Sequence, residues 1–498
     1  MKKLKKLAVL LLAVVMTMAM NMTVFAADGT TGDTTTAEGY TLTLNGTAEG
    51  HTYEAYQIFT GDLSEDKSGG RVLSNVKWGT GVNYTGTESA ADVAKALGDG
   101  TMKIAQLEEK LTLTTSVKEV KSTETSTVID GLAAGYYLVK DQDGTQAGKS
   151  DAYTKFIVQV VGDTTAAVKS AVPTVEKKVM DTNDSTGETS NKWQDSADYD
   201  IGDDVPFQIT GTMPSRIDDY TTYKYVFTDT MSKGLTYNDN AEIKIGEKDV
   251  TSSFEKNMTK NDDGSTVVTW SCGNLKGIDG VTLNKDTKVV VTYSAKLNKD
   301  AVIGSAGNPN TVNLTYSNNP NKGGEGETGK TPDDKNIVFT YKTVVNKVDQ
   351  DKKSLKGAAF KLEKKLSDGT YKEVQSFTAG EETTFEFKGL DDGEYRLTET
   401  TTPAGYNKID PVEFTISAEH DTESNDPKLT GLSVSKTSAG AMFAADKDAG
   451  SLTTDIVNQK GSNLPSTGGV GTRMFYVFGG CLVAAAAVLL ALKKRREA

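Results

Sequence analysis

Short runs in which apolar and polar residues alternate are the main pattern along this chain. In TKVVVTYSAKL, residues 287–297, an apolar side chain stands at every second position after Lys288. A repeat of two residues is typical of a strand with one buried face, and the many threonines also favour strands. One stretch, SAADVAKALGDGTMKIAQLEEKL at 89–111, instead spaces its apolar residues three to four positions apart, which predicts helix. The pattern therefore predicts a mainly β fold.

The predicted strands fall into groups that we interpret as successive domains. An N-terminal domain spans 27–172, a middle domain that opens at Pro173 spans 173–341, and a third domain spans 342–460. Glycine, asparagine and proline are concentrated in turns, as in NNPNKGGEGETGKTPDD near the end of the middle domain. Many short strands at this spacing are typical of immunoglobulin-like β-sandwiches, and we expect such sandwiches in tandem.

Both ends of the chain carry apolar segments with basic flanks. Residues 1–26 combine four lysines with a short apolar run, which predicts a secretory signal peptide cleaved after Ala26. A first transmembrane helix is the alternative, but the run is short for a bilayer. Residues 474–492 are apolar and long enough to span a membrane, and basic residues 493–496 predict a cytoplasmic C-terminus. We therefore expect everything between the two segments to lie outside the cell, and 461–498 to form a separate C-terminal region.

Charge and rare residues exclude several function classes. A formal net charge of −13 argues against a nucleic-acid partner. The two histidines, His51 and His420, fall in different domains, so a Ser-His-Asp hydrolase or a histidine-rich metal site is hard to build. We expect no metal, no cofactor and no enzymatic activity towards a substrate. Cys272 and Cys481 are not placed to pair, so the exported part needs a source of stability other than disulfides.

Two sets of lysine, acid and asparagine are candidates for chemistry. In the third domain Lys347, Glu399 and Asn458 are polar residues flanked by apolar ones, at positions where alternation can point each of them inward. In the middle domain the corresponding order is Lys177 or Lys178, then Asp229, then Asn310. Asn310 shares its strand face with three apolar residues by the period of two, namely Val312, Leu314 and Tyr316.

Burial would give such a set an unusual reactivity. An unpaired buried lysine tends to lose its proton, and a buried carboxyl tends to keep one. A neutral amine held against an asparagine side chain can then displace ammonia and leave a Lys–Asn isopeptide bond, with proximity supplying much of the rate. The alternative is an ordinary exposed lysine, a capping acid and a turn asparagine, and the spacing alone favours this alternative because lysines are usually exposed.

The C-terminal motif resembles a known signal. LPSTG, followed by an apolar run and a basic tail, is similar to the sortase sorting signal of Gram-positive surface proteins. The resemblance implies that a transpeptidase cleaves between the threonine and the glycine and joins the threonine to an amine. The mature subunit would then span 27–467, and the apolar segment would hold the precursor in the membrane only until cleavage. The motif residues are Leu464, Pro465, Ser466, Thr467 and Gly468.

Other stretches resemble sortase-assembled backbone pilins. KVDQDKKSLKGAAFKL is similar to the start of a CnaB-type domain, and YRLTETTTPAGY, residues 395–406, is similar to the E-box of these pilins. FTDTMSKGLTY and GNPNTVNLTYSNNP resemble the isopeptide-forming fimbrial middle domain, and TYEAYQIFTGD with NVKWGTGV resembles the N-terminal domain. The resemblance implies Cna-type sandwiches and two internal bonds, each joining a first strand to a last strand. The implied bonds are Lys177–Asn310, assisted by Asp229, and Lys347–Asn458, assisted by Glu399.

One expected motif is missing. Backbone pilins often carry Tyr-Pro-Lys, whose lysine receives the threonine of the next subunit, but here Thr174 follows Pro173. Lys169 is our first candidate for the acceptor and Lys178 the second.

The sequence thus predicts a shaft subunit of a covalent pilus anchored to the Gram-positive cell wall. The implied partners are pilin-type and housekeeping sortases, identical subunits, accessory pilins, peptidoglycan and host surface ligands. A wall-anchored adhesin or tip pilin that binds host matrix or glycans is the alternative function. An adhesin would typically add a large, less regular binding module, whereas this sequence shows three modest domains.

Overall fold

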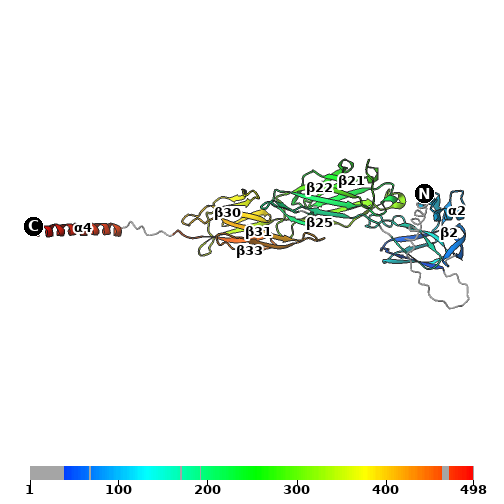
Figure 1. Ribbon diagram of the computed structural model, residues 1–498, viewed down its shortest axis with the longest axis horizontal. Coiled ribbons are helices and arrows are strands. Elements are labelled where there is room, and N and C mark those ends of the chain that lie inside the picture. Colours follow the sequence, from blue (N-terminus) through cyan, green and yellow to red (C-terminus); the bar gives the residue numbers. More distant parts are fainter. Residues whose placement is uncertain (1–38, 67–68, 169–170, 191, 462–469, 497–498) are drawn as a thin grey trace, which may run out of the picture.

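The computed structural model describes residues 39–66, 69–168, 171–190, 192–461 and 470–496. Three β-rich units follow one another along the long axis of the molecule, and helix α4 (Val470–Arg496) lies at the end opposite the first unit (Figure 1). The mainly β prediction is confirmed. The predicted signal peptide, Lys169 and the LPSTG motif lie outside the described residues.

The first unit combines small sheets with two short helices. Strand β1 lies between β10 and β7, and a second sheet has the order β3-β2-β8-β9, with β6 also paired to β2. Leu42 and Leu44 of β1 pack against Tyr53 and Ala55 of β2, so the period of two fills the core between these sheets. The elements are β1 (Tyr40–Asn45), β2 (Thr52–Glu65), β3 (Arg71–Trp78), β4 (Val82–Tyr84), α2 (Ala90–Gly98), α3 (Ile104–Glu108), β5 (Leu111–Leu113), β6 (Lys118–Lys121), β7 (Ser126–Leu132), β8 (Gly135–Asp141), β9 (Lys155–Val160) and β10 (Thr164–Ala167).

The helical stretch predicted at 89–111 forms two helices instead of one. Ser89 caps α2, with its side chain accepting from the backbone N–H of Asp92. Gly100 has a φ of +71°, a conformation that favours glycine and separates α2 from α3. Val93 of α2 is buried against the β2 sheet in a second core.

The second unit is a two-sheet sandwich with the largest core in the described structure. One sheet has the order β11-β15-β22-β18-β19 and the other β14-β25-β23-β16-β21-β20. Tyr225, Phe227 and Leu314 are among the side chains between them. The strands are β11 (Val175–Val179), β12 (Thr182–Asn183), β13 (Glu188–Thr189), β14 (Ser196–Asp198), β15 (Asp204–Thr212), β16 (Tyr225–Met231), β17 (Leu235–Tyr237), β18 (Glu242–Ile245), β19 (Lys248–Asp249), β20 (Glu255–Lys260), β21 (Thr266–Cys272), β22 (Lys288–Leu297), β23 (Asn308–Ser317), β24 (Thr328–Lys330) and β25 (Asp334–Phe339).

Four single-turn 3₁₀ helices connect strands of this unit. They are η1 (Ile217–Asp219), η2 (Thr251–Ser253), η3 (Leu275–Gly277) and η4 (Pro320–Lys322).

The third unit is a smaller sandwich in which the first and last strands are neighbours. Its sheets have the orders β29-β26-β34-β33 and β28-β27-β30-β31-β32. Strand β26 pairs with β34 in parallel, with Lys347 opposite Ile456 and Asp349 opposite Asn458. The strands are β26 (Tyr341–Asp349), β27 (Ala359–Lys365), β28 (Tyr371–Phe377), β29 (Thr384–Leu390), β30 (Gly393–Thr401), β31 (Val412–His420), β32 (Leu429–Ser435), β33 (Phe443–Asp446) and β34 (Ser451–Asn458).

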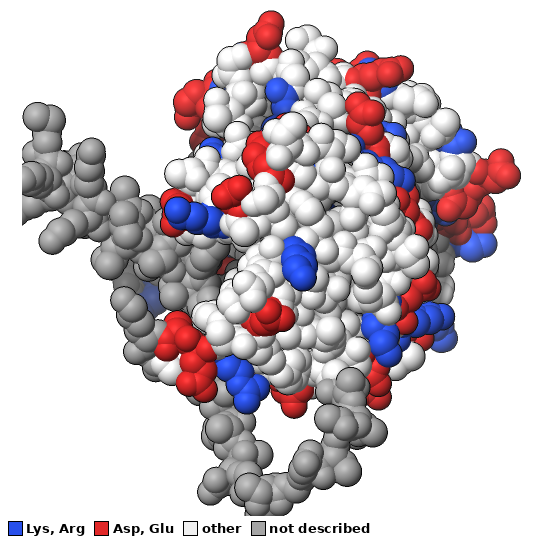
Figure 2. Space-filling model, turned by 90° about the vertical axis from the view of Figure 1, so that its right-hand side faces the viewer, with Lys and Arg blue, Asp and Glu red and all other residues white. Residues whose placement is uncertain are grey.

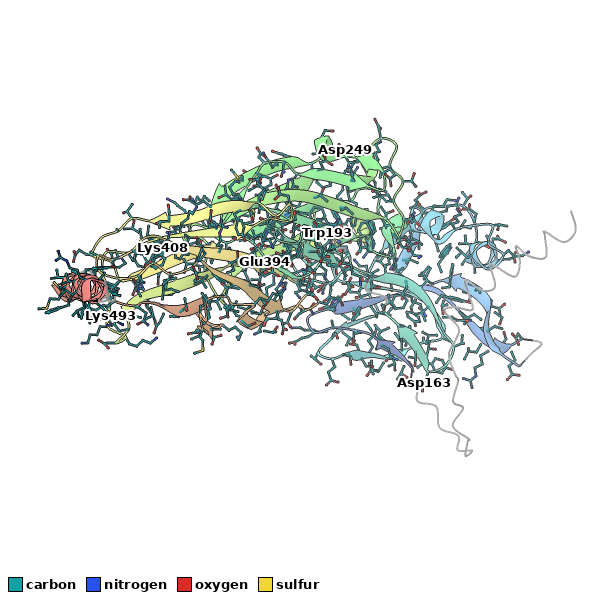
Figure 3. The ribbon with its side chains drawn as sticks, turned by 60° about the vertical axis from the view of Figure 1, so that its left-hand side comes forward. Asp163, Trp193, Asp249, Glu394, Lys408 and Lys493 are labelled. Carbon is teal, nitrogen blue, oxygen red and sulfur yellow. The ribbon has the colours of Figure 1, made fainter. Side chains whose placement is uncertain are left out.

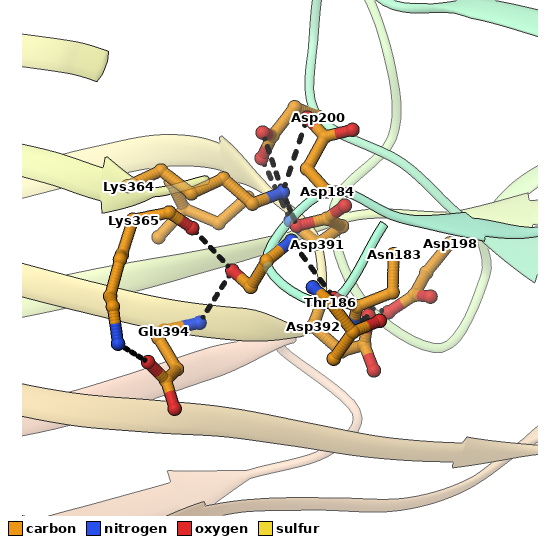
Figure 4. A network of polar contacts seen from close by, with 12 residues as sticks. Asn183, Asp184, Thr186, Asp198, Asp200, Lys364, Lys365, Asp391, Asp392 and Glu394 are labelled. Atoms are coloured by element: carbon orange, nitrogen blue, oxygen red, sulfur yellow. Dashed lines mark hydrogen bonds and ion pairs between the residues drawn. The ribbon is translucent and has the colours of Figure 1, made fainter. Parts of the chain in front are cut away.

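Polar contacts join the units to one another. At the first joint the hydroxyl of Tyr316 donates to the carbonyl of Ser150 at 2.6 Å, and Asn318 donates to the carbonyl of Gln146 at 2.7 Å. At the joint between the second and third units, Asn183 donates to Asp392 at 2.7 Å and Lys364 donates to Asp200 at 2.9 Å (Figure 4). Figure 3 places Trp193 and Glu394 near the middle of the molecule, close to where the second and third units meet.

The exposed end of the first unit carries both signs of charge. Acidic and basic side chains are interspersed around the face seen along the long axis (Figure 2). Such mixing fits a soluble exterior and not an electrostatic docking surface on this face.

Helix α4 covers the apolar run predicted from residues 474–492. Its apolar side chains, such as Phe475 and Leu489, are exposed. In the part of the chain that the structure describes, no helix meets the length and apolarity required to cross a membrane. The helix is therefore confirmed, and its predicted transmembrane character is not.

Candidate isopeptide sites

The first candidate site lies in the core of the second unit. Lys177 comes from β11 and Tyr293 from β22 in one sheet, whereas Asp229 on β16 and Asn310 on β23 belong to the other. Lys177, Asp229 and Asn310 are each fully buried. Alternation along each strand turns these polar residues inward among apolar neighbours, as the sequence predicted. Of the two lysines that the sequence left open, the side chain of Lys177 is fully buried in this core, whereas that of Lys178 is 20% exposed.

Hydrogen bonds connect all four side chains. Nζ of Lys177 donates to Oδ1 of Asp229 at 2.6 Å and to the hydroxyl of Tyr293 at 2.7 Å. The same hydroxyl donates to Oδ2 of Asp229 and accepts from Nδ2 of Asn310, the latter at 2.8 Å. Oδ1 of Asn310 is buried without a hydrogen-bond partner among the described residues. Tyr293 therefore links the acid to the amide nitrogen.

Burial shifts the proton equilibria of this site towards neutral groups. Desolvation lowers the pKa of Lys177 although Asp229 opposes the shift, and desolvation raises the pKa of Asp229 although Lys177 opposes it. Phe207 and Tyr293 place aromatic rings about the amine, with 5.4 and 5.1 Å from Nζ to the two ring centroids. Transfer of the proton from lysine to aspartate gives a neutral amine and a carboxylic acid, the two species that amide attack needs.

The second candidate site lies in the core of the third unit. Lys347 on β26, Glu399 on β30 and Asn458 at the end of β34 are all buried. Nζ of Lys347 donates to the carbonyl of Ile456 at 2.8 Å and lies 3.9 Å from Oε1 of Glu399. Nδ2 of Asn458 donates to Oε2 of Glu399 at 3.1 Å and to the carbonyl of Asn407 at 2.8 Å. The acid thus lies between the amine and the amide.

This second lysine is poorly stabilised as an ammonium ion. Burial lowers the pKa of Lys347 to about 8, and the charge of Glu399 offsets only part of the shift. Oε1 of Glu399 and Oδ1 of Asn458 are buried without hydrogen-bond partners among the described residues. Unpaired buried polar atoms are costly, so these two oxygens destabilise the site in the arrangement described.

A further buried lysine shows that burial alone does not produce this state. Nζ of Lys364 on β27 contacts Asp391 and lies 2.9 Å from Oδ2 of Asp200 in the second unit (Figure 4). Burial would lower its pKa, but the two carboxylates outweigh burial and raise it. Lys364 therefore remains an ammonium ion in an ion-pair network.

The structure brings together every residue of the two predicted sets, but it corrects one detail of their placement. In the third unit the predicted bond joins the first strand, β26, to the last, β34. In the second unit Asn310 lies on β23, and β24 and β25 follow it, so this bond does not reach the last strand. Strand β25 carries the chain onwards by pairing with β23 and with β14.

Sequence reasoning missed three contributors to these sites. Tyr293 follows the alternation of β22 and reads as an ordinary core aromatic, so its contact with Asp229 depends on a partner in the other sheet. Thr402 donates to Oε2 of Glu399 at 3.0 Å, and Asn407 contributes a backbone carbonyl. Backbone acceptors leave no signal in the sequence.

The second acceptor candidate, Lys178, lies in an open groove at the surface. Nζ is 2.7 Å from Oδ1 of Asp195 and 3.2 Å from Oε1 of Glu176. Burial opposes the shift, but these two acids raise the pKa of Lys178. Trp193 and Asn425 also line the groove, which therefore spans residues of the second and third units.

Three family models match separate parts of the chain. The model described as Gram-positive pilin backbone subunit 2, Cna-B-like domain, matches residues 201–320. A prealbumin-like fold domain matches 342–428, and the LPXTG cell wall anchor motif matches 456–498. The first match includes Asp229, Tyr293 and Asn310.

The chain is also similar to proteins of known sequence or structure. The trypsin-resistant surface T6 protein of Streptococcus pyogenes serotype M6 is 24% identical over 400 residues, which cover 67% of this chain and 70% of that protein. The solved T6 backbone pilin of serotype M6 Streptococcus pyogenes has a TM-score of 0.52 at 18% identity and covers 85% of this chain and 98% of its own, which shows a shared fold. The major pilin SpaD of Corynebacterium diphtheriae has a TM-score of 0.49 at 20% identity and covers 85% of this chain and 98% of its own.

Proposed function

Because this chain is a Gram-positive backbone pilin, a structural subunit of a pilus shaft with an LPXTG cell wall anchor, we propose that two internal isopeptide bonds stabilise it. The bonds are Lys177–Asn310 and Lys347–Asn458. The observation that carries the proposal is that the second and third units each bury a lysine, a carboxyl and an asparagine in one cluster, in which Tyr293 connects Asp229 with Asn310 in the second unit. The structural role and the cell wall location expected from the sequence are confirmed, and the matched family is structural and not enzymatic.

The reaction in the third unit needs only the groups present. The neutral amine of Lys347 attacks the side-chain carbonyl carbon of Asn458, and a new C–N bond forms. Glu399 takes a proton from Nζ as the amine attacks and gives a proton to Nδ2. The bond between the carbonyl carbon and Nδ2 then breaks, and ammonia leaves. The hydrogen bond from Nδ2 to Oε2 already holds the leaving nitrogen beside the acid.

The reaction in the second unit uses one more group. Asp229 contacts the amine of Lys177 directly, but the amide nitrogen of Asn310 contacts Tyr293. The Tyr293 hydroxyl can therefore pass a proton from Asp229 to the departing nitrogen while remaining unchanged overall. We assign Asp229 as the acid and Tyr293 as the relay between acid and leaving group.

The two bonds would carry tension differently. In the third unit Lys347 and Asn458 lie on adjacent parallel strands at the entry and exit of the chain, so force would pass directly from β26 to β34. In the second unit the residues after Asn310 lie outside the closed loop. Force there would continue through β24 and β25, which stay attached to β23 by backbone pairing.

Assembly depends on the C-terminal anchor. The chain is a sortase substrate that polymerises with pilin subunits and attaches to peptidoglycan. We propose that a pilin-type sortase joins Thr467 to Lys169 of the next subunit, with Lys178 as the second candidate, and that a housekeeping sortase completes attachment to the wall. The domain limits 27–172, 173–341 and 342–460, accessory pilins and host surface ligands stay predictions.

Mass spectrometry of the purified pilus tests the internal bonds. Each bond should lower the mass of the subunit by one ammonia, and tandem spectra should contain branched peptides linking Lys177 to Asn310 and Lys347 to Asn458. Lys177→Ala and Lys347→Ala should each restore one loss independently. A subunit with its full unreacted mass would overturn the proposal.

A further inference from the structure

A histidine and two aspartates from different units meet at the second joint. His420 ends β31 of the third unit, Asp198 ends β14 of the second, and Asp181 lies between β11 and β12. Ligand atoms of the three residues all lie within 4.8 Å of one another. Nε2 of His420 is 3.7 Å from Oδ2 of Asp181 and 4.0 Å from Oδ1 of Asp198.

Hydrogen bonds determine which nitrogen of His420 carries the proton. The hydroxyl of Ser196 donates to the carbonyl of Asp421 at 2.5 Å, so its oxygen is left to accept from Nδ1 of His420 at 2.7 Å. Nδ1 therefore bears the hydrogen, and the lone pair of Nε2 points towards two carboxylates. This lone pair and the carboxylate oxygens that it faces are atoms of the kind that bind a metal cation.

The acids at this position lack basic partners. Asp181, Asp198 and the neighbouring Asp392 form no ion pair with lysine or arginine among the described residues. The nearby acidic group of Asp184, Asp200 and Asp203 differs, because Lys364 contacts two of its members. The two groups are therefore not equivalent.

A fully buried tyrosine also faces the first group. The hydroxyl of Tyr341 is buried and makes no hydrogen bond of good geometry among the described residues, and Asp198 is the acid that acts on it. A buried hydroxyl normally has a partner, so this one independently indicates that the group around Asp198 is incomplete.

We propose that Asp181, Asp198 and His420 bind a divalent transition-metal cation of the Zn²⁺ type, which links the second and third units. Bonds of about 2.0–2.2 Å from metal to nitrogen or oxygen separate neighbouring ligand atoms by roughly 3–4 Å, as observed here. An imidazole among the ligands favours such a cation over Ca²⁺ or Mg²⁺, which prefer oxygen alone.

Hydrogen bonds from neighbouring residues hold the three proposed ligands in position. Ser196 orients the imidazole, Gln194 donates to Oδ2 of Asp181 at 3.2 Å, and the backbone N–H of Asp392 donates to Oδ2 of Asp198 at 3.0 Å. Such contacts orient ligands, and at Asp198 the hydrogen bond goes to Oδ2 while Oδ1 faces His420. The two proposed isopeptide bonds lie within single units, so the cation would add a cross-link where neither of them acts.

Metal titration of the full chain tests the site. The chain, purified in detergent and freed of metal with a chelator, is titrated with Zn²⁺, Mn²⁺ or Ca²⁺ alone, and binding is followed by calorimetry and native mass spectrometry. We expect one Zn²⁺ per chain, bound more tightly than Ca²⁺, and a higher melting temperature with Zn²⁺. His420→Ala and the near-isosteric Asp181→Asn should each weaken binding at least about tenfold.

Two matched variants control for other sites. Asp184→Asn alters the acidic group that already contains Lys364, and His51→Gln removes the other histidine, so both should keep the Zn²⁺ affinity of the parent chain. The absence of stoichiometric Zn²⁺ binding, equal affinity in Asp181→Asn and the parent, or tighter binding of Ca²⁺ than of Zn²⁺ would each overturn the proposal.

Discussion

Lys347 and Lys364 are both fully buried in the third unit, but the pKa of Lys347 is lowered and that of Lys364 is raised. Lys347 lies 3.9 Å from its one carboxylate, whereas Lys364 contacts Asp391 and lies 2.9 Å from Asp200. A single distant acid does not compensate for lost hydration, and two adjacent acids do. The number of carboxylates in contact with a buried lysine therefore distinguishes Lys347, the proposed nucleophile, from Lys364, which forms ion pairs.

The first prediction concerns the third unit. Lys347→Ala should restore the mass of one ammonia and lower the free energy of unfolding by about 4–5 kcal/mol, because the closed loop is about 100 residues long. Glu399→Gln keeps the size of the side chain but removes the acid, so it should also leave the bond unformed. Intact mass and urea unfolding measure both effects.

A lysine on the same strand provides the control. Lys342 is also on β26, but its side chain is partly exposed and pairs with Glu386 at 3.1 Å. Lys342→Ala should leave the mass deficit unchanged and affect stability only slightly. An ammonia loss that persists in Lys347→Ala would contradict the assignment.

The second prediction concerns Tyr293. Tyr293→Phe retains the aromatic packing against Phe207 but removes the hydroxyl that connects Asp229 with Asn310. The Lys177–Asn310 bond should form more slowly, by about 10²-fold if proton transfer limits the reaction. The mass of freshly synthesised protein, followed over time, gives the rate. A rate equal to that of the parent chain would assign Tyr293 a packing role only.

The third prediction concerns the joint between the second and third units. Lys364→Met removes the cation from a buried network and leaves Asp200 and Asp391 facing each other, so unfolding should become easier by about 3–5 kcal/mol. Adding Asp391→Asn should recover part of this loss by removing one of the charges. Urea unfolding of the single and double variants measures the coupling, and strict additivity of the two changes would show that the residues act separately.

The fourth prediction is a pH dependence in the first unit. Burial would lower the pKa of His51, but hydrogen bonds to Asp141 and Asp151 raise it to about 9, above its usual value of 6.5. The folded state therefore binds more protons, so this stabilisation is complete below pH 6.5 and is lost as the pH rises through about 9. Melting temperatures of the parent and His51→Gln should converge across that range. A difference that is constant with pH would exclude a charged His51.

Strand alternation indicated that both sets could point inward, because it fixes which face of a strand each residue occupies. It left open the choice between Lys177 and Lys178, whose burial differs only in the packed structure. Asn310 shares a face with Val312 and Leu314, and all three are buried as expected. Alternation within one strand does not predict which residues meet across two sheets or between two units. Tyr293 meets Asp229 only when two sheets pack, and His420 meets Asp198 only when two units dock.

The number of strands that follow Asn310 could not be predicted from the sequence. Period-two alternation placed Asn310 on a strand face but could not say how many strands follow. Strand β24 is short and lies within the glycine-rich stretch 318–334, and β25 begins at its end, so the sequence suggested a loop near the end of the domain. The predicted bond consequently reaches β23 and not the last strand.

The last prediction decides between the two acceptor lysines. Arginine retains the positive charge of lysine but does not act as an amine acceptor for the sortase reaction, so Lys169→Arg and Lys178→Arg are matched substitutions. Asp195 and Glu176 form ion pairs with Lys178 and raise its pKa. A lysine that stays protonated is a poorer nucleophile than a neutral amine. Lys169→Arg should abolish the ladder of covalent polymers on a denaturing gel, and Lys178→Arg should retain it. Loss of the ladder only in Lys178→Arg would instead make the groove beside Trp193 the docking position for the threonine of the next subunit.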